Sequence, residues 1–163
     1  MALALGRSGD GELVAHLDDE AATLDLGALL AEALHSGLKI YLSGELGAGK
    51  TTLVRGILRG LGYQGRVRSP TFTLVELYEL SRLDLYHFDF YRFKDPTEWI
   101  DAGFREAFGA AAVCLVEWPE KAAGRLPRAD LHIRLEHADA GRHVRLVADT
   151  NEGKQCLQQL SAT

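Results

Sequence analysis

The chain has 163 residues, of which 47% are hydrophobic and 25% charged, and its net charge is −5. This is the length of one domain, with enough apolar residues for a core that needs neither disulfides nor a structural metal. An acidic chain is not expected to bind nucleic acid over its whole surface. The two cysteines form no Cys-x-x-Cys pair, and the sequence shows neither a signal-peptide pattern nor a long apolar run. We therefore expect a cytoplasmic protein without a membrane span.

The first predicted elements form a β-α-β unit. Alternating apolar residues predict a strand over 11–17. An apolar stripe at helical spacing predicts a helix over 20–35, with Asp18 or Asp19 as its N-cap. An apolar run then predicts a second strand over 39–43.

A phosphate-binding motif follows this second strand. The stretch Gly-Glu-Leu-Gly-Ala-Gly-Lys-Thr, residues 44–51, fits Gly-x-x-x-x-Gly-Lys-Ser/Thr and precedes a predicted helix over 52–61. Glycines let several backbone N–H groups point into one concavity, and the helix start adds its positive dipole end. We expect Lys50 to contact the β- and γ-phosphates and Thr51 to bind Mg²⁺. The residues expected at the nucleotide in this stretch are Glu45, Leu46, Gly47, Ala48, Gly49, Lys50, Thr51 and Thr52.

The second half of the chain predicts strands on both sides of one helix. Two β-rich runs, 72–80 and 83–91, are separated by two residues and predict a hairpin. An Asp-Pro-Thr-Glu start predicts a helix over 95–108, and a near-continuous apolar run predicts a buried strand over 112–117. Alternating residues within 131–146 predict a second hairpin.

The expected fold is an α/β, P-loop NTPase-like three-layer sandwich. Its central sheet is expected to be mixed and mostly parallel, with the two antiparallel hairpins attached. Residues 1–150 are expected to form a single domain. Residues 151–163 show no strong pattern and are expected to be a loose C-terminal tail.

Two carboxylates lie toward the carboxyl ends of predicted strands. Asp89 shares one face of the predicted strand 83–91 with His87 and Tyr91, and Glu117 closes the buried strand. Open α/β sheets bind ligands at the carboxyl ends of their strands, so both are candidates for the nucleotide site. Ordinary alternatives remain open: Asp89 as an exposed hairpin carboxylate, Glu117 as a salt-bridged strand end, His87 as a structural histidine and Trp118 as a core aromatic residue.

Four motifs in order resemble one known family. After the phosphate loop come Ser-Pro-Thr-Phe (69–72), His-x-Asp-x-Tyr-Arg (87–92) and Glu-Trp (117–118). This series resembles that of the bacterial TsaE family, formerly YjeE, small P-loop ATPases needed to make threonylcarbamoyladenosine in tRNAs that read ANN codons. The resemblance covers 18 to about 135. The family's usual Asp after the first glycine is Glu45 here, a conservative departure.

The resemblance implies a role for each matching residue. Lys50 and Thr51 would bind phosphate and Mg²⁺, Asp89 would supply a second metal contact, and Glu117 would orient or activate the attacking water and lie at the metal. Thr71 would lie in a switch-like loop that senses the γ-phosphate, and Trp118 would lie near the nucleotide.

The resemblance also implies cofactors and partners. The cofactors would be ATP and Mg²⁺, and hydrolysis would be weak alone. The protein partners would be TsaB and TsaD. The family docks at the interface of these two proteins, and its ATP turnover permits their repeated catalytic cycles. The protein would contact tRNA only indirectly or within that complex. The chain alone is expected to be a monomer.

The residues exclude one other function and leave two open. A GTPase is excluded because the only asparagine, Asn151, begins no Asn-Lys-x-Asp motif. A small-molecule P-loop kinase remains open, with Arg66 and Arg68, or Lys121 and Arg125, as lid cations. The third possibility is a nucleotide-gated binding module in which hydrolysis is incidental.

Overall fold

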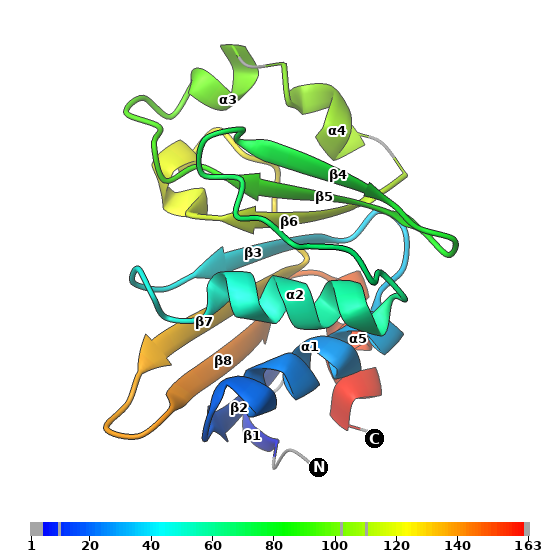
Figure 1. The fold of residues 1–163 in the computed structure, drawn as a ribbon, viewed down its shortest axis with the longest axis vertical. Helices are drawn as coiled ribbons and strands as arrows, with labels where there is room; N and C mark the ends of the chain where they lie inside the picture. Colours follow the sequence, from blue (N-terminus) through cyan, green and yellow to red (C-terminus); the bar gives the residue numbers. More distant parts are fainter. Residues whose placement is uncertain (1–4, 10, 102, 110, 162–163) are drawn as a thin grey trace.

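The structure is a computed structural model that describes residues 5–9, 11–101, 103–109 and 111–161. Its strands are β1 (Gly6–Gly9), β2 (Glu12–Leu17), β3 (Lys39–Ser43), β4 (Val75–Glu79), β5 (Asp84–Asp89), β6 (Val113–Glu117), β7 (Leu131–His137) and β8 (Arg142–Ala148). Within the described residues they form one eight-stranded sheet in the order β1-β2-β8-β7-β3-β6-β5-β4 (Figure 1). Strands β7, β3, β6 and β5 are parallel, and the strands outside them pair antiparallel.

Helices lie on both faces of this sheet. The helices are α1 (Glu20–Ala33), α2 (Lys50–Gly60), α3 (Glu98–Asp101), α4 (Arg105–Gly109), α5 (Asn151–Ser161) and a 3₁₀ helix, η1 (Pro119–Ala122). One core lies between the sheet and α1, α2 and α5, and a second, aromatic core lies between the other face and α3, α4 and η1 (Figure 1). The predicted α/β fold, with a parallel sheet centre and antiparallel hairpins, is confirmed. Among the described residues no helix is long and apolar enough to cross a membrane.

The first helix begins where its capping residue predicts and ends two residues early. The Asp19 carboxylate accepts a hydrogen bond from the Ala22 amide at 2.9 Å, which satisfies one of the free N–H groups of the first turn. At the other end, the Arg82 guanidinium donates to the carbonyls of Ala31 and Leu34. Arg82, in the turn between β4 and β5, thus caps the C-terminal end of α1. The sequence did not predict this contact, and the helix predicted over 20–35 was two residues too long.

The helix predicted over 95–108 is wrong as one continuous element. The predicted capping interaction at its start is present, because the Glu98 carboxylate accepts hydrogen bonds from the amides of Lys94 and Asp95. The helix is nevertheless divided into α3 and α4, and Gly103 lies between them with φ of +79°. A residue in the left-handed region cannot continue a right-handed helix.

The predicted loose tail is also wrong over the described residues, because Asn151–Ser161 forms α5. Gly153, Cys156, Leu157 and Leu160 are buried against the core, at a spacing that puts them on one helical face. The Thr150 hydroxyl accepts a hydrogen bond from the Gly153 amide and donates one to Asp130. The tail is therefore capped and packed, beside α1 (Figure 1).

The closest approach of α1 and α2 supplies a test of this packing. A Cβ built on Gly27 would lie 2.7 Å from the Cα of Gly56, which is backbone and cannot move aside cheaply. We expect Gly27→Ala to cost about 2–3 kcal/mol in overpacking, against the roughly 1 kcal/mol that alanine gains in a helix, which leaves a net loss of about 1–2 kcal/mol. The melting temperature should fall by about 2–8 °C. Gly109→Ala is the control, since a Cβ there meets no atom within 4 Å; an equal melting temperature in both variants would contradict the close-packing argument.

Candidate functional site

The phosphate loop connects the central strand β3 to the start of α2 (Figure 1). Gly47 and Gly49 have φ of +79° and +105°, in the region that side chains with a Cβ rarely adopt. Gly49 is the N-cap of α2 and has no side chain to satisfy the first-turn amides. These amides and the positive end of the helix dipole are therefore available to an anion.

Lys50 is held against the loop and an aromatic ring. Its Nζ donates to the Gly44 carbonyl and, at 3.4 Å, to the Glu45 carbonyl, and it lies 3.7 Å from the ring centroid of Trp118. Burial lowers the pKa of Lys50 below its ordinary value, whereas the carboxylates of Glu117, Glu120 and Asp89 act in the opposite direction. A phosphate placed in the loop would replace the carbonyls as a stronger partner of this ammonium group.

Sheet register brings the two strand-end carboxylates together. Asp89 on β5 is paired with Glu117 on β6, and Glu117 is also paired with Leu42 on β3, directly before the loop. Side chains alternate along a strand, so Asp89 and Glu117 lie on the face that Leu85 and Leu115 present to the α2 core. Both carboxylates are 3% exposed. The exposed-hairpin alternative for Asp89 is thus wrong.

Hydroxyl groups connect these carboxylates to the loops around them. Thr51 Oγ1 donates to Glu117 Oε2 at 3.3 Å, and Thr71 Oγ1 donates to Asp89 Oδ2 at 3.1 Å. Burial raises the pKa of Asp89, opposed by the hydrogen bond from the Tyr91 amide; the Glu117 charge raises it further. The loop before β4 is therefore linked through Thr71 to Asp89, and the start of α2 is linked through Thr51 to Glu117, the residue paired with Asp89 in the sheet.

These groups surround one hollow of about 430 Å³. Its lining includes most of the residues predicted at the nucleotide: Leu46, Gly47, Gly49, Lys50, Thr51, Thr52, Ser69, Thr71, Asp89, Tyr91, Glu117 and Trp118. A larger hollow of about 660 Å³ lies on the open face of β2, β7 and β8 and contains none of them. We place the candidate site in the smaller hollow because the phosphate loop and both carboxylates meet there.

The donor set suits a magnesium ion held jointly with phosphates. Among the described residues no three His, Cys, Asp or Glu side chains cluster as a ready-made metal cage. Mg²⁺ is normally bound by one or two carboxylates together with substrate phosphates and water, with hydroxyl and carboxylate oxygens as ligands. Thr51, Asp89 and Glu117 supply oxygens of this kind at the edge of the phosphate loop.

A second hollow of about 400 Å³ lies on the other side of the phosphate loop. It shares Gly47, Gly49 and Thr52 with the first and is otherwise lined by Ala48, the start of α1, the turn before β8 and Arg142. Arg142 of β8 donates to the loop carbonyls of Ala48 and Gly47, at 3.2 and 3.1 Å. The phosphate loop therefore lies between the two hollows and is supported by the last hairpin.

Comparison with known proteins identifies the family. Residues 17–145 match the model of the family described as threonylcarbamoyl adenosine biosynthesis protein TsaE. The chain belongs to the TsaE family.

Individual relatives agree over most of the chain. A protein of Haemophilus influenzae named tRNA threonylcarbamoyladenosine biosynthesis protein TsaE is 44% identical over 154 residues, covering 91% of this chain and 98% of that one. A Bacillus subtilis protein of the same name is 39% identical over 140 residues, covering 85% and 87% of the two chains. The crystal structure of Bacillus subtilis YdiB matches with a TM-score of 0.81 and 30% identity, over 98% of this chain and 97% of that one.

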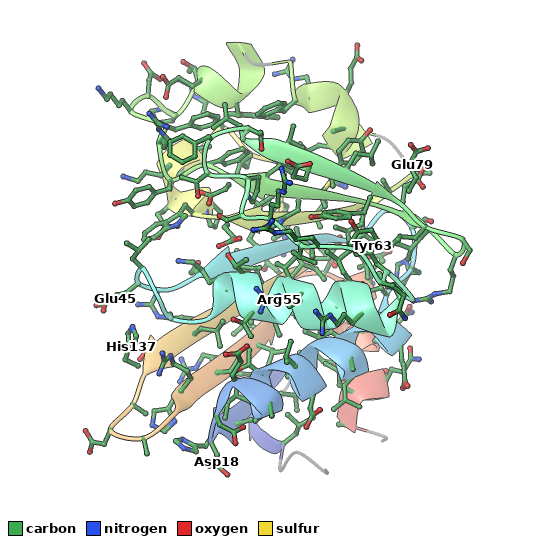
Figure 2. All side chains as sticks on the ribbon, in the orientation of Figure 1. Asp18, Glu45, Arg55, Tyr63, Glu79 and His137 are labelled. Atoms are coloured by element: carbon green, nitrogen blue, oxygen red, sulfur yellow. The ribbon has the colours of Figure 1, made fainter. Side chains whose placement is uncertain are left out.

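The structure brings together most of the residues predicted for the site. Lys50, Thr51, Thr71, Asp89 and Glu117 all line the hollow beside the phosphate loop. Glu45 and Ala48 do not, although Ala48 lines the second hollow. Glu45 is exposed at the outer end of the loop, where Figure 2 shows it pointing away from the sheet, and Ala48 is buried beneath the loop.

Two contacts at the site were missed from the sequence. Arg142 was not a candidate, because nothing in its local sequence signals a contact with a loop more than ninety residues earlier. A structural role for His87 was left open, and its Nε2 lies 2.6 Å from Glu117 Oε2, a pairing that the sequence did not predict. Its position two residues before Asp89 on the same strand face was the available signal.

Proposed function

We propose that this protein is a Mg²⁺-dependent ATPase of tRNA threonylcarbamoyladenosine biosynthesis, acting in the cytoplasm. The observation that carries the proposal is the convergence of Thr51, Asp89 and Glu117 on the phosphate loop in one hollow. The family and its relatives are named for this biosynthesis, which supports the pathway. Binding of ATP, its hydrolysis and the partners are our inference.

Each residue has a part in this reaction. The loop amides and Lys50 would hold the phosphates, and Thr51 and Asp89 would hold Mg²⁺. The ion would neutralise charge that develops on the phosphate oxygens. Glu117, buried at 3% exposure and fixed at its Oε2, would orient the attacking water and accept its proton.

The base and ribose would occupy the second hollow. A nucleotide with its β- and γ-phosphates near Lys50 extends past Thr52, which lines both hollows. The first turn of α1 and Arg142 border this space. The missing guanine-reading motif and the family resemblance support adenine as the base.

The kinase alternative gains no support from the geometry. Arg66, Arg68, Lys121 and Arg125 were the candidate lid cations, and none of them appears in the lining of the hollow. Lys121 instead lies 5.8 Å from the centroid of the Tyr91 ring.

The test is hydrolysis and tRNA modification in a reconstituted system. The purified protein is incubated with ATP and Mg²⁺, with and without TsaB and TsaD, threonylcarbamoyl adenylate and tRNA. We expect the partners to raise hydrolysis and modification to continue past one cycle only when this protein is present. Hydrolysis that ignores the partners, together with phosphate transfer to a small hydroxylated metabolite, would favour the kinase instead. Affinity changes in the partners without turnover would favour a binding module.

Removal of the Asp89 charge is expected to change the magnesium requirement. Asp89→Asn keeps the shape and an oxygen for the hydrogen bond from the Tyr91 amide, and its amide nitrogen can donate to the Thr71 hydroxyl, but the charge that attracts the ion is removed. We expect the Mg²⁺ concentration for half-maximal hydrolysis to rise about tenfold or more. Asp84→Asn, at the exposed start of the same strand, is the matched control. An unchanged magnesium titration in Asp89→Asn would remove Asp89 from the metal site.

A further inference from the structure

Glu117 has a buried partner on the neighbouring strand. His87 is fully buried and Glu117 is 3% exposed, and their Nε2 and Oε2 atoms are 2.6 Å apart. The pair is set by the sheet, because β5 and β6 run parallel with His87 opposite Leu115 and Asp89 opposite Glu117. With no water between them, the two side chains hold each other in one geometry.

The ring donates the proton of this hydrogen bond. An ionised carboxylate only accepts, so the hydrogen-bond pattern assigns the proton to Nε2 of His87. The other ring nitrogen, Nδ1, is buried and has no hydrogen-bond partner among the described residues. An unpaired buried polar atom costs about 1–3 kcal/mol, which an apolar residue of similar size would avoid. The bond to Glu117 is the only side-chain hydrogen bond of the ring in the described part of the chain.

The contacts of Glu117 are divided unequally between its two oxygens. Both side-chain hydrogen bonds that it makes with described residues, from Thr51 and His87, end on Oε2. Glu117 also lines the hollow beside the phosphate loop. Oε1 makes no side-chain hydrogen bond with the described residues, which leaves it as the atom that can bind a water in that hollow.

We propose that His87 is a positioning residue that holds Glu117 Oε2 so that Oε1 faces the reacting water. This inference rests on the proposed function and assigns a role to a residue that touches neither nucleotide nor metal. It is of the kind seen where a second side chain orients a catalytic carboxylate, and loss of such a partner typically reduces activity by about 10- to 100-fold.

Two amide substitutions distinguish a role of His87 as a hydrogen-bond donor to Glu117 from a role in which its side chain only fills space in the core. In His87→Gln the amide nitrogen is as many bonds from Cα as Nε2 of histidine, so it can donate to Glu117. In His87→Asn the amide is one methylene shorter and cannot reach. We expect His87→Asn to lower kcat for ATP hydrolysis about 10- to 100-fold with KM changed less than about twofold, and His87→Gln to stay within about fivefold of wild type.

The second part of the experiment measures whether the effects of substituting His87 and Glu117 on kcat depend on each other. In a Glu117→Gln background, adding His87→Asn should lower kcat by no more than about twofold, because the residue through which His87 acts is already disabled. Circular dichroism and melting curves establish that each variant is folded. Equal losses in His87→Gln and His87→Asn, no loss in His87→Asn, or losses that multiply with Glu117→Gln would each overturn the proposal.

A measurement without turnover keeps this inference apart from the proposed function. The Mg²⁺ dependence of ADP affinity is measured by titration calorimetry for wild type and both His87 variants. We expect His87→Asn, and not His87→Gln, to raise the Mg²⁺ midpoint by about fivefold or more, because a displaced Oε2 also disturbs Thr51, which donates to it and would hold the ion. If wild type bound Mg²⁺ and nucleotide but never hydrolysed ATP, the proposed function would fail while this midpoint still decided the role of His87. Identical midpoints in all three proteins would overturn the inference.

Discussion

Glu117→Gln is expected to bind ATP within about threefold of wild type and to hydrolyse it at least about 100-fold more slowly. Glutamine retains the volume and can keep an oxygen toward Thr51 and His87, so the buried pair is not left unmatched. What is lost is the charge that orients water and accepts its proton. Removing a group of this kind typically costs a factor of 10² to 10⁴ in rate.

The measurement is single-turnover hydrolysis with the protein in excess, alone and with TsaB and TsaD, beside equilibrium binding of ATP. Glu106→Gln is the control, because Glu106 is exposed in α4 and does not line the hollow. Hydrolysis at the wild-type rate in Glu117→Gln would remove Glu117 from the mechanism. A parallel loss of ATP affinity would instead make it a binding residue.

Lys50→Ala is expected to lower nucleotide affinity about 100-fold or more. The Lys50 ammonium is already directed at the loop carbonyls of Gly44 and Glu45, at the point where phosphate oxygens would lie. Hydrogen bonds between charged groups contribute about 1.5–3 kcal/mol each, and one ammonium can make more than one to a polyphosphate. A loss of about 2.7 kcal/mol corresponds to a hundredfold change in the dissociation constant.

The measurement is titration with ADP or ATP by calorimetry, with Mg²⁺ present. Lys154→Ala is the matched control, because Lys154 is exposed on α5, far from the phosphate loop. A melting curve tests whether Lys50→Ala has lost its fold, since Lys50 itself is 4% exposed and packs on Trp118. Unchanged affinity in a folded Lys50→Ala protein would rule out the phosphate loop as the nucleotide site.

Features that depend on near neighbours were predictable from the sequence. The phosphate loop is such a feature, because its glycines and the helix that follows it all lie within a few residues of Lys50. The capping of α1 by Asp19 is another. The strand end at Glu117 was also predictable, since a near-continuous apolar run ends there and α/β sheets bind ligands at strand ends. Asp89 was predicted inside a strand over 83–91, whereas β5 ends at Asp89.

Features that depend on partners far along the chain were not predictable. The α5 pattern is short and its apolar face is weak by itself, so its burial depends on α1 and β8. The break at Gly103 depends on a backbone angle that helix-forming neighbours do not reveal. Arg82 and Arg142 act on loops and helix ends separated from them by long stretches of chain, and no local pattern marks such contacts.

The sequence by itself determined the phosphate loop, the α/β class and the candidate residues Lys50, Thr51, Asp89 and Glu117. Each is set by local geometry: glycine freedom, helix capping and the alternation of side chains along a strand. Only the tertiary structure decided that the register of β5 on β6 puts His87 beside Glu117 and Asp89 level with it. Register is set by the packing of whole strands against both cores, and a shift of one residue would turn all of these side chains to the opposite face.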